Sequence, residues 1–128
     1  MSAPVELRIG TDIVDIRRLE TRIAKSRNDY VARFWTAKER SDSRGDPGRL
    51  AARWAAKEAC MKTLRRGIGR IDPIDIETVL IDSVPFLRLH LSALEAAQEE
   101  NLGGWQVSLS REREWATAVV IAQGGFNG

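Results

Sequence analysis

LAARWAAKEACMKTL, residues Leu50–Leu64, is the stretch from which the fold of this chain follows. It contains no Gly or Pro and is dominated by Ala, Leu, Met, Lys, Arg and Glu, the residues with the highest helix propensity. These features predict a helix of about four turns. A helical projection gathers its bulky apolar residues on one face, which is typical of a helix that packs into a core. These residues are Leu50, Trp54, Met61 and Leu64.

A second face of this predicted helix combines small and charged residues: Ala51, Ala55, Glu58 and Lys62. Glu58 and Lys62 lie one turn apart, and many such pairs are solvated and contribute only about 0.2–0.5 kcal/mol. The alternative is functional, because an acid and a base beside methyl-sized neighbours leave room for a ligand against the helix. The apolar character of the rest of the helix favours the functional interpretation, since charged residues are rare on buried helices.

Length and composition predict one globular domain over residues 1–128, because 128 residues with 43% hydrophobic content form a single core. A net charge of +2 argues against a dedicated nucleic-acid-binding protein, while 30% charged residues allow a local anion site. The single cysteine, Cys60, is typical of a small core residue in a reducing compartment. We find no apolar run of membrane-spanning length and no apolar signal segment, and therefore expect a cytoplasmic protein without membrane contact.

An alternating apolar pattern precedes the central helix. Val5, Leu7 and Ile9 predict a strand that ends at Gly10, and a helix is expected from Ile13 onward. Asp12 would then lie at the junction between strand and helix. A carboxylate there caps free backbone N–H groups, or binds a metal because a strand end holds it rigidly.

The helix expected after this junction has a basic surface at Arg17, Arg18 and Arg22. Such a run forms a solvated face or docks an acidic partner. Further on, Thr36–Glu39 has capping-box spacing and predicts a short helix, with a structural role for its glutamate. The polar stretch Ser41–Gly48 is expected to be a loop.

The residues after the central helix read RRGIGR, from Arg65 to Arg70. The simplest interpretation is a helix C-cap with arginines that complement the helix dipole. Alternatively, glycine permits close approach of the backbone, and the arginines, together with Lys62, form a basic cradle for a polyphosphate.

The second half of the chain alternates strand and helix patterns joined by short turns. This order predicts an α+β domain with an antiparallel sheet packed with the long central helix. The expected elements are strands Ile74–Ile81 and Phe86–Leu91, a helix Ser92–Asn101 that opens on a capping box, and strands Trp105–Leu109 and Trp115–Ala122.

Four motifs together resemble the holo-acyl-carrier-protein synthase group of 4′-phosphopantetheinyl transferases, in order from about Ile9 to Ile121. They are Gly10–Val14 (GTDIV), Leu50–Ala59 (LAARWAAKEA) followed by Lys62, Asp75–Glu77 (DIE) and Ser108–Ser110 (SLS). The resemblance implies a 4′-phosphopantetheinyl transferase-like fold. It also implies Mg²⁺-dependent transfer of the 4′-phosphopantetheine arm of coenzyme A to a serine of an apo acyl carrier protein, in fatty acid or polyketide biosynthesis, leaving adenosine 3′,5′-bisphosphate.

The same resemblance implies roles for individual residues. Asp12 and Glu58 would bind Mg²⁺, and Lys62 would contact the pyrophosphate, so that Glu58 and Lys62 are the catalytic residues. Glu58 would also help the carrier serine to lose its proton. Members of this short type form homotrimers with active sites between subunits. The remaining implied contacts are with coenzyme A, through Arg53, Arg65, Gly67 and Arg111, and with the acidic carrier protein, through Arg18 and Arg22.

Two of these positions depart from the pattern of the group. Arg65 stands where relatives commonly have Gly, and Arg111 stands where they commonly have His. Arginine can hold a phosphate but cannot act as a neutral base. A second hypothesis is therefore a catalytically impaired transferase-like module that binds a carrier protein or a nucleotide, although the retained metal ligands favour the enzyme.

Overall fold

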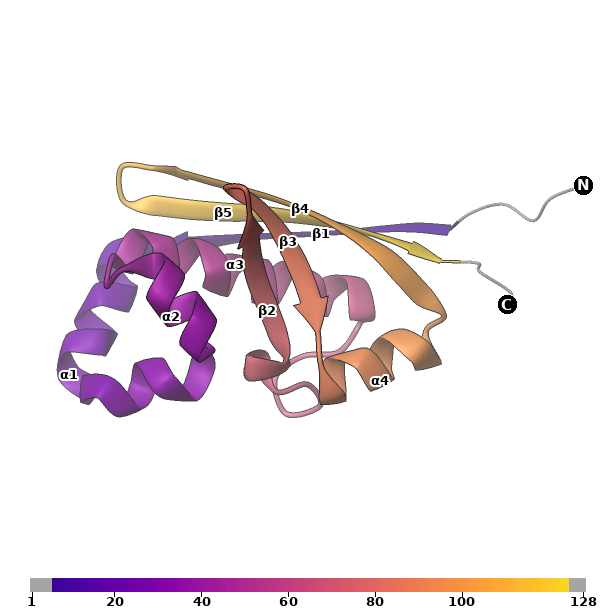
Figure 1. Cartoon of the computed structure of the whole chain (residues 1–128), viewed down its shortest axis with the longest axis horizontal. Helices are drawn as coiled ribbons and strands as arrows, with labels where there is room; N and C mark the ends of the chain where they lie inside the picture. The colour runs from indigo at the N-terminus through magenta and orange to yellow at the C-terminus, as the bar shows by residue number, and fades with distance from the viewer. Residues whose placement is uncertain (1–5, 125–128) are drawn as a thin grey trace, which may run out of the picture.

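The computed structural model describes residues 6–124 and, for Arg27 and Asn28, the backbone alone. Figure 1 shows how its helices and strands are arranged. In chain order they are β1 (Glu6–Asp15), α1 (Ile16–Phe34), α2 (Ala37–Ser43), α3 (Pro47–Leu64), a 3₁₀ turn (Pro73–Asp75), β2 (Ile76–Ile81), β3 (Val84–Leu89), α4 (Leu91–Glu99), β4 (Leu102–Glu112) and β5 (Trp115–Gly124).

Two antiparallel sheets organise these elements. The larger has the strand order β1-β5-β4, and the smaller is the hairpin β2–β3. α3 lies along one face of the larger sheet, with the other helices on that same side (Figure 1). The predicted α+β architecture, an antiparallel sheet packed with a long central helix, is confirmed.

α3 packs closely on the sheet because both surfaces carry small side chains. One face of α3 was expected to leave room for a ligand beside its alanines. The sheet covers these alanines, and this part of the prediction is therefore wrong. Lys62 stays exposed and Glu58 is half-buried at the edge of the contact. The buried alanines of α3 and β5 include Ala51, Ala55 and Ala59 of α3 and Ala116, Ala118 and Ala122 of β5.

Gly10 lies where β1 crosses α3. A Cβ atom at this position would come within 1.9 Å of the Ala59 carbonyl oxygen. The glycine therefore permits close approach of the helix rather than ending the strand, and the predicted strand end is wrong. β1 continues to Asp15, which caps α1 by accepting hydrogen bonds from two backbone N–H groups. Asp12 consequently lies inside the strand; the predicted start of this strand, Val5, is outside the described residues.

Two further boundaries differ from the sequence-based expectation. The loop expected over Ser41–Gly48 is short, because α2 extends to Ser43 and α3 begins at Pro47. The capping box expected at Ser92 does not form: His90 is the N-cap of α4, and Ser92 donates to Asp75 instead. By contrast, the capping box of α2 is present as predicted.

A buried ion pair ties α3 to the elements around it. Lys57 is fully buried, and its Nζ donates to Glu39 Oε1 at 2.7 Å, to the Pro73 carbonyl at 2.9 Å and to the Ile76 carbonyl. The second Glu39 oxygen accepts the Thr78 backbone N–H. Burial lowers the pKa of Lys57, and the carboxylate of Glu39 opposes that shift. This ion pair was not predicted from the sequence.

The hydrophobic core extends from α3 into β5 and α4. It includes Cys60, as expected, and burial raises the pKa of this thiol to about 12. Leu64, Ile76 and Val120 are among its largest members. Across residues 6–124, none of the helices combines the length and apolar character needed to cross a membrane.

We predict that Gly10→Ala destabilises the protein. Overpacking typically costs about 1–3 kcal/mol, and here the obstacle is helix backbone, which cannot turn aside. Urea unfolding followed by circular dichroism measures the change. Gly103→Ala is the matched control, because a Cβ there meets no atom within 4 Å. Equal stability of the two variants would contradict the close approach of α3 and β1.

Candidate functional site

β1 and α3 bring Asp12 and Lys62 together. Alternation along β1 places Asp12 on the face that carries Gly10, toward α3. Lys62 Nζ donates to the Thr11 carbonyl at 2.7 Å and lies 3.4 Å from Asp12 Oδ1. The partner of Lys62 in the described part of the chain is therefore Asp12 rather than Glu58, one turn earlier on α3.

Asp12 and Glu58 line one hollow of about 270 Å³, which we call the carboxylate hollow. Burial and then the negative charge of Asp12 raise the pKa of Glu58, while Lys62 opposes the shift. The carboxylates of Asp12 and Glu58 thus share a partly buried surface, and Lys62 is the cation that opposes the shift at Glu58. The other charged and aromatic residues that line the hollow are Asp15, which caps α1, and Arg18, Arg22, Tyr30 and Trp54.

The carboxylate hollow fits Mg²⁺. Mg²⁺ prefers oxygen ligands, takes one or two carboxylates from protein and completes its shell with phosphate and water. Asp12 and Glu58 provide that number of carboxylates. Within residues 6–124 no three Asp, Glu, His or Cys side chains are grouped to hold a metal by themselves. A cation between Asp12 and Glu58 would relieve the repulsion that raises the pKa of Glu58.

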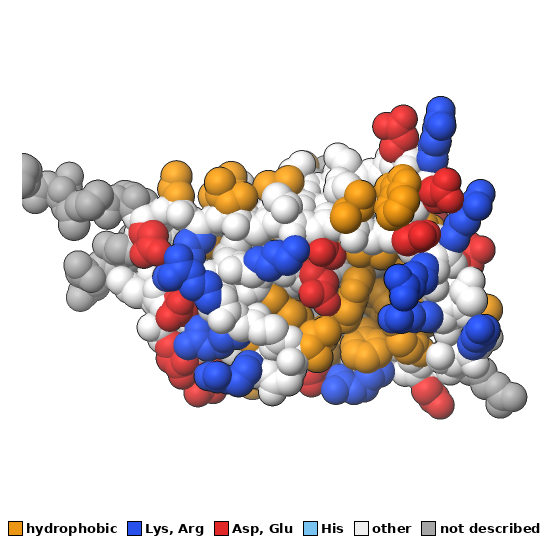
Figure 2. Space-filling view, turned by 180° about the vertical axis from the view of Figure 1, so that it is seen from behind, with side chains coloured by type: hydrophobic (Ala, Val, Ile, Leu, Met, Phe, Trp, Pro, Cys, Tyr) orange, Lys and Arg blue, Asp and Glu red, His pale blue; other side chains and the backbone are white. Residues whose placement is uncertain are grey.

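An apolar and basic border surrounds the two carboxylates. Three aromatic rings pack edge to face. The ring centroid of Phe34 lies 5.0 Å from that of Tyr30 and 5.5 Å from that of Trp54. Arg18 and Arg22 are exposed on α1 at the rim of the same hollow. Figure 2 shows the molecule from behind. Apolar side chains gather on the half of this view that holds α1, with basic and acidic side chains at their border.

On its other side, Glu58 lines a neighbouring hollow with Lys62, Arg65 and Gly67. Arg65 is the C-cap of α3 and adopts the left-handed conformation, with φ 57° and ψ 34°. This conformation favours glycine, which agrees with the glycine that the family resemblance implies at this position. The arginine is accommodated with its side chain exposed, and a Cβ added at Gly67 would meet nothing within 4 Å. The structure thus brings Glu58, Lys62, Arg65 and Gly67 together.

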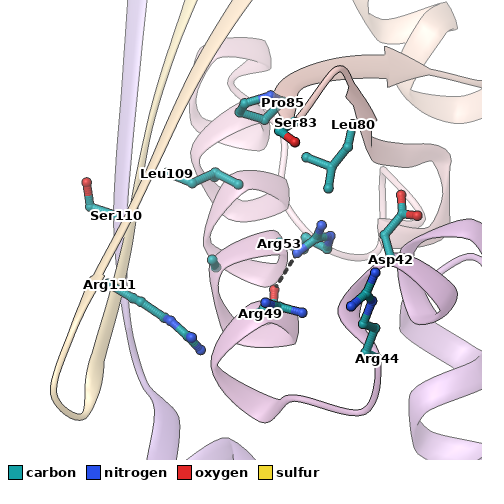
Figure 3. A pocket seen from close by; sticks show the side chains of 11 residues that line it. Asp42, Arg44, Arg49, Arg53, Leu80, Ser83, Pro85, Leu109, Ser110 and Arg111 are labelled. Atoms are coloured by element: carbon teal, nitrogen blue, oxygen red, sulfur yellow. Dashed lines mark hydrogen bonds between the residues drawn. The ribbon is translucent and has the colours of Figure 1, made fainter.

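Arg53 and Arg111 lie in a different place, a hollow of about 500 Å³ that we call the arginine hollow (Figure 3). Arg53 is buried and donates to the Arg49 carbonyl at 3.1 Å, while its Nε has no partner among the described residues. Arg111 reaches across from β4 to pair with Asp46 at 2.8 Å. Arg44 also lines this hollow.

Helix geometry explains this separation. Arg53 and Lys62 are nine residues apart, which at about 100° per residue places them on opposite sides of α3. Arg44, Asp46 and Arg49 were not predicted as site residues from the sequence. Arginines near the start of the central helix were a usable signal, but the contact between Asp46 and Arg111 joins residues 65 positions apart.

We predict that Glu58→Gln stabilises the metal-free protein at neutral pH. Because the folded-state pKa of Glu58 is raised, folding favours its protonated form, and stability is lost as pH rises through that pKa. The difference in Tm between the variant and the wild type should shrink as pH falls toward about 4, the ordinary range of glutamate. Thermal melts between pH 4 and 8 measure it, with Glu95→Gln on α4 as the control for loss of one charge. A constant difference would contradict the assigned burial.

The chain is similar to known proteins of one family. The family model described as the 4′-phosphopantetheinyl transferase superfamily matches residues 8–120. A holo-[acyl-carrier-protein] synthase of Moorella thermoacetica is 41% identical over 125 residues, covering 94% of this chain and 97% of that protein. One of Herpetosiphon aurantiacus is 35% identical, covering 90% and 97%.

A solved structure agrees as well. The crystal structure of Helicobacter pylori holo-[acyl-carrier-protein] synthase in complex with coenzyme A superposes with a TM-score of 0.82 and 28% identity, covering 90% of this chain and 99% of that one. The residues matched by the family model, 8–120, include most of β1 and all of α3, which carry Asp12, Glu58 and Lys62. The chain belongs to the 4′-phosphopantetheinyl transferase superfamily.

Proposed function

We propose that the protein transfers the 4′-phosphopantetheine arm of coenzyme A to a serine of an apo acyl carrier protein in a Mg²⁺-dependent reaction. The serine oxygen forms a bond to the β-phosphorus of coenzyme A, the bond from that phosphorus to the bridging oxygen breaks, and adenosine 3′,5′-bisphosphate leaves. The observation that carries this proposal is the convergence of Asp12, Glu58 and Lys62 where α3 meets β1.

Each of these residues has a role that its position supports. Asp12 and Glu58 would hold Mg²⁺, which when bound supplies positive charge to the pyrophosphate. Lys62 is exposed and projects from α3 beside them, where its ammonium group would bind the pyrophosphate as charge builds on the leaving phosphate. Glu58 would accept the proton of the carrier serine.

The acidic carrier protein would dock on α1. Arg18 and Arg22 line the carboxylate hollow with their side chains exposed, so an acidic helix bound to them would place its serine near Glu58. Tyr30 and Trp54 line the same hollow and offer apolar contact to the carrier protein beside these two arginines.

Coenzyme A would bind between two subunits. It carries two separate anionic groups, the pyrophosphate and the 3′-phosphate of its ribose. Lys62, with Arg65 and Gly67 beside it, would take the first, and Arg53 and Arg111 would take the second. Because α3 itself separates these two sets within one chain, the second set would come from a neighbouring subunit.

The larger sheet has a face that suits such an assembly. Its helices all lie on one side, and its other side exposes Leu7, Ile9 and Ile13 of β1 and Val119 of β5, each between 40% and 66% exposed. Exposed apolar patches of this kind mark protein interfaces. We propose that this face joins three copies into a homotrimer with head-to-tail contacts.

The first test is intact-mass analysis of apo acyl carrier protein incubated with the protein, coenzyme A and Mg²⁺. We expect the carrier to gain the mass of one phosphopantetheine, and EDTA to prevent the gain. Asp12→Asn and Glu58→Gln should abolish it, with Glu95→Gln as the active control. Carriers from fatty acid and polyketide synthesis should both be tried. Binding of a carrier or of coenzyme A without transfer would instead indicate a catalytically impaired module.

The second test asks whether the site is shared. We predict that Glu58→Gln and Arg111→Glu chains are each impaired at low coenzyme A concentration but regain activity when co-expressed. In a head-to-tail trimer, each site would combine Glu58 of one subunit with Arg111 of the next. Every trimer that contains both variants therefore has one interface at which both residues are intact. Differently tagged chains purified in tandem provide the mixed trimers. Activity no higher than that of the separate variants would contradict a site between subunits.

The third test concerns docking. We predict that Arg18→Glu with Arg22→Glu raises the KM for the carrier protein, because the charges that attract it are reversed. The effect should shrink at high salt, where exposed charges are screened. Arg88→Glu, on the exposed side of β3, is the matched control. An unchanged KM at low salt would contradict docking on α1.

A further inference from the structure

Asp46 makes two different hydrogen bonds with its two carboxylate oxygens. Oδ1 accepts the Gly48 backbone N–H at 2.9 Å and so caps the N-terminus of α3. Oδ2 accepts from Arg111 Nη1 at 2.8 Å. Because the first bond fixes the carboxylate on the helix, the second bond has a fixed acceptor, and one residue connects the start of α3 with β4.

Gly48 leaves the space that this contact needs. It is buried in the first turn of α3, and a Cβ atom there would come within 2.0 Å of Arg111 Nη1. Any larger residue would push the guanidinium group away from Asp46. Asp46, Gly48 and Arg111 are therefore complementary in charge and in shape.

Arg111 keeps most of its donors for another partner. A guanidinium group has five N–H donors. Among the described residues, the side chain of Arg111 donates a hydrogen bond to Asp46. Figure 3 shows the Arg111 side chain extending from β4 toward the first turn of α3 and Arg49. Four arginines and one aspartate, Asp42, line the hollow. With Asp46 counted as the ion-pair partner of Arg111, a formal charge of +2 is left for an anion.

The charge state of Asp46 suits a permanent anchor. Desolvation would raise its pKa, but the hydrogen bonds from Arg111 and from the Gly48 N–H lower it below the ordinary value. The carboxylate thus stays ionised, and the pair persists at neutral pH.

We propose that Asp46 is a positioning residue for coenzyme A: it holds the guanidinium group of Arg111 at the mouth of the arginine hollow, with its free N–H donors available to an anionic group of the substrate. This rests on the proposed function in so far as coenzyme A is the ligand. A free arginine side chain loses the freedom of several torsion angles when it binds a ligand. Because the carboxylate of Asp46 already holds Arg111 in place, part of that entropic cost is removed.

The test is equilibrium binding of coenzyme A and of adenosine 3′,5′-bisphosphate to the full-length protein by calorimetry, with steady-state kinetics beside it. Asp46→Asn keeps a capping side chain and removes the charge, and Asp46→Ser is a second variant with the same property. We expect a weaker Kd and a higher KM for coenzyme A, by about fivefold, with kcat unchanged. In an Arg111→Gln background the same substitution should have no further effect.

Asp72→Asn is the matched control, since Asp72 also caps a helical turn and pairs with an arginine, Arg33, at 3.1 Å. It should leave coenzyme A binding unchanged. A lower Tm without a change in Kd would assign Asp46 a purely structural role and overturn the proposal, as would tighter binding, which would mean that Asp46 competes with the ligand. Weaker binding together with absent phosphopantetheine transfer would support the positioning role while rejecting the proposed enzyme activity.

Discussion

The buried ion pair between Lys57 and Glu39 is the interaction on which the rest of the structure depends. It links α3 to α2, to the turn before β2 and to β2 itself. Removing one partner of such a pair costs about 3–5 kcal/mol, a large part of the 5–15 kcal/mol that stabilises a typical domain. Since successive helical residues point about 100° apart, fixing Lys57 in the interior turns Glu58 outward to the site.

The close contact of α3 with the sheet then assembles the site. Alanines on both surfaces and Gly10 on β1 allow the helix backbone to approach the strand. As a result Asp12 lies beside Lys62, although fifty positions separate them in the chain. The same helix keeps Arg53 on its opposite side, so Arg53 lines the arginine hollow and not the carboxylate hollow.

Particular residues show where sequence reasoning succeeds and where it stops. The helix was evident because Leu50–Leu64 has high propensity throughout, and the Thr36–Glu39 capping box was evident because its bonds are local. Gly10 was misread because glycine also weakens strands, and nothing local indicates that a helix backbone lies above it. Lys57 lies within the same predicted helix, but its acceptors belong to three other segments, so nothing local indicated the buried ion pair.

By itself the sequence determined the central helix, the α+β class, the family motifs and the presence of Asp12, Glu58 and Lys62. Local propensity and periodicity are sufficient for the helix and the class, whereas the motifs and the roles of these three residues were implied by the resemblance to a known family. Only the tertiary structure decided that Asp12 lies within a strand, that the alanine face is covered, and that Arg111 meets Asp46 in a separate hollow. These outcomes depend on strand register and on helix-to-sheet distance, which are set by contacts between residues far apart in the chain.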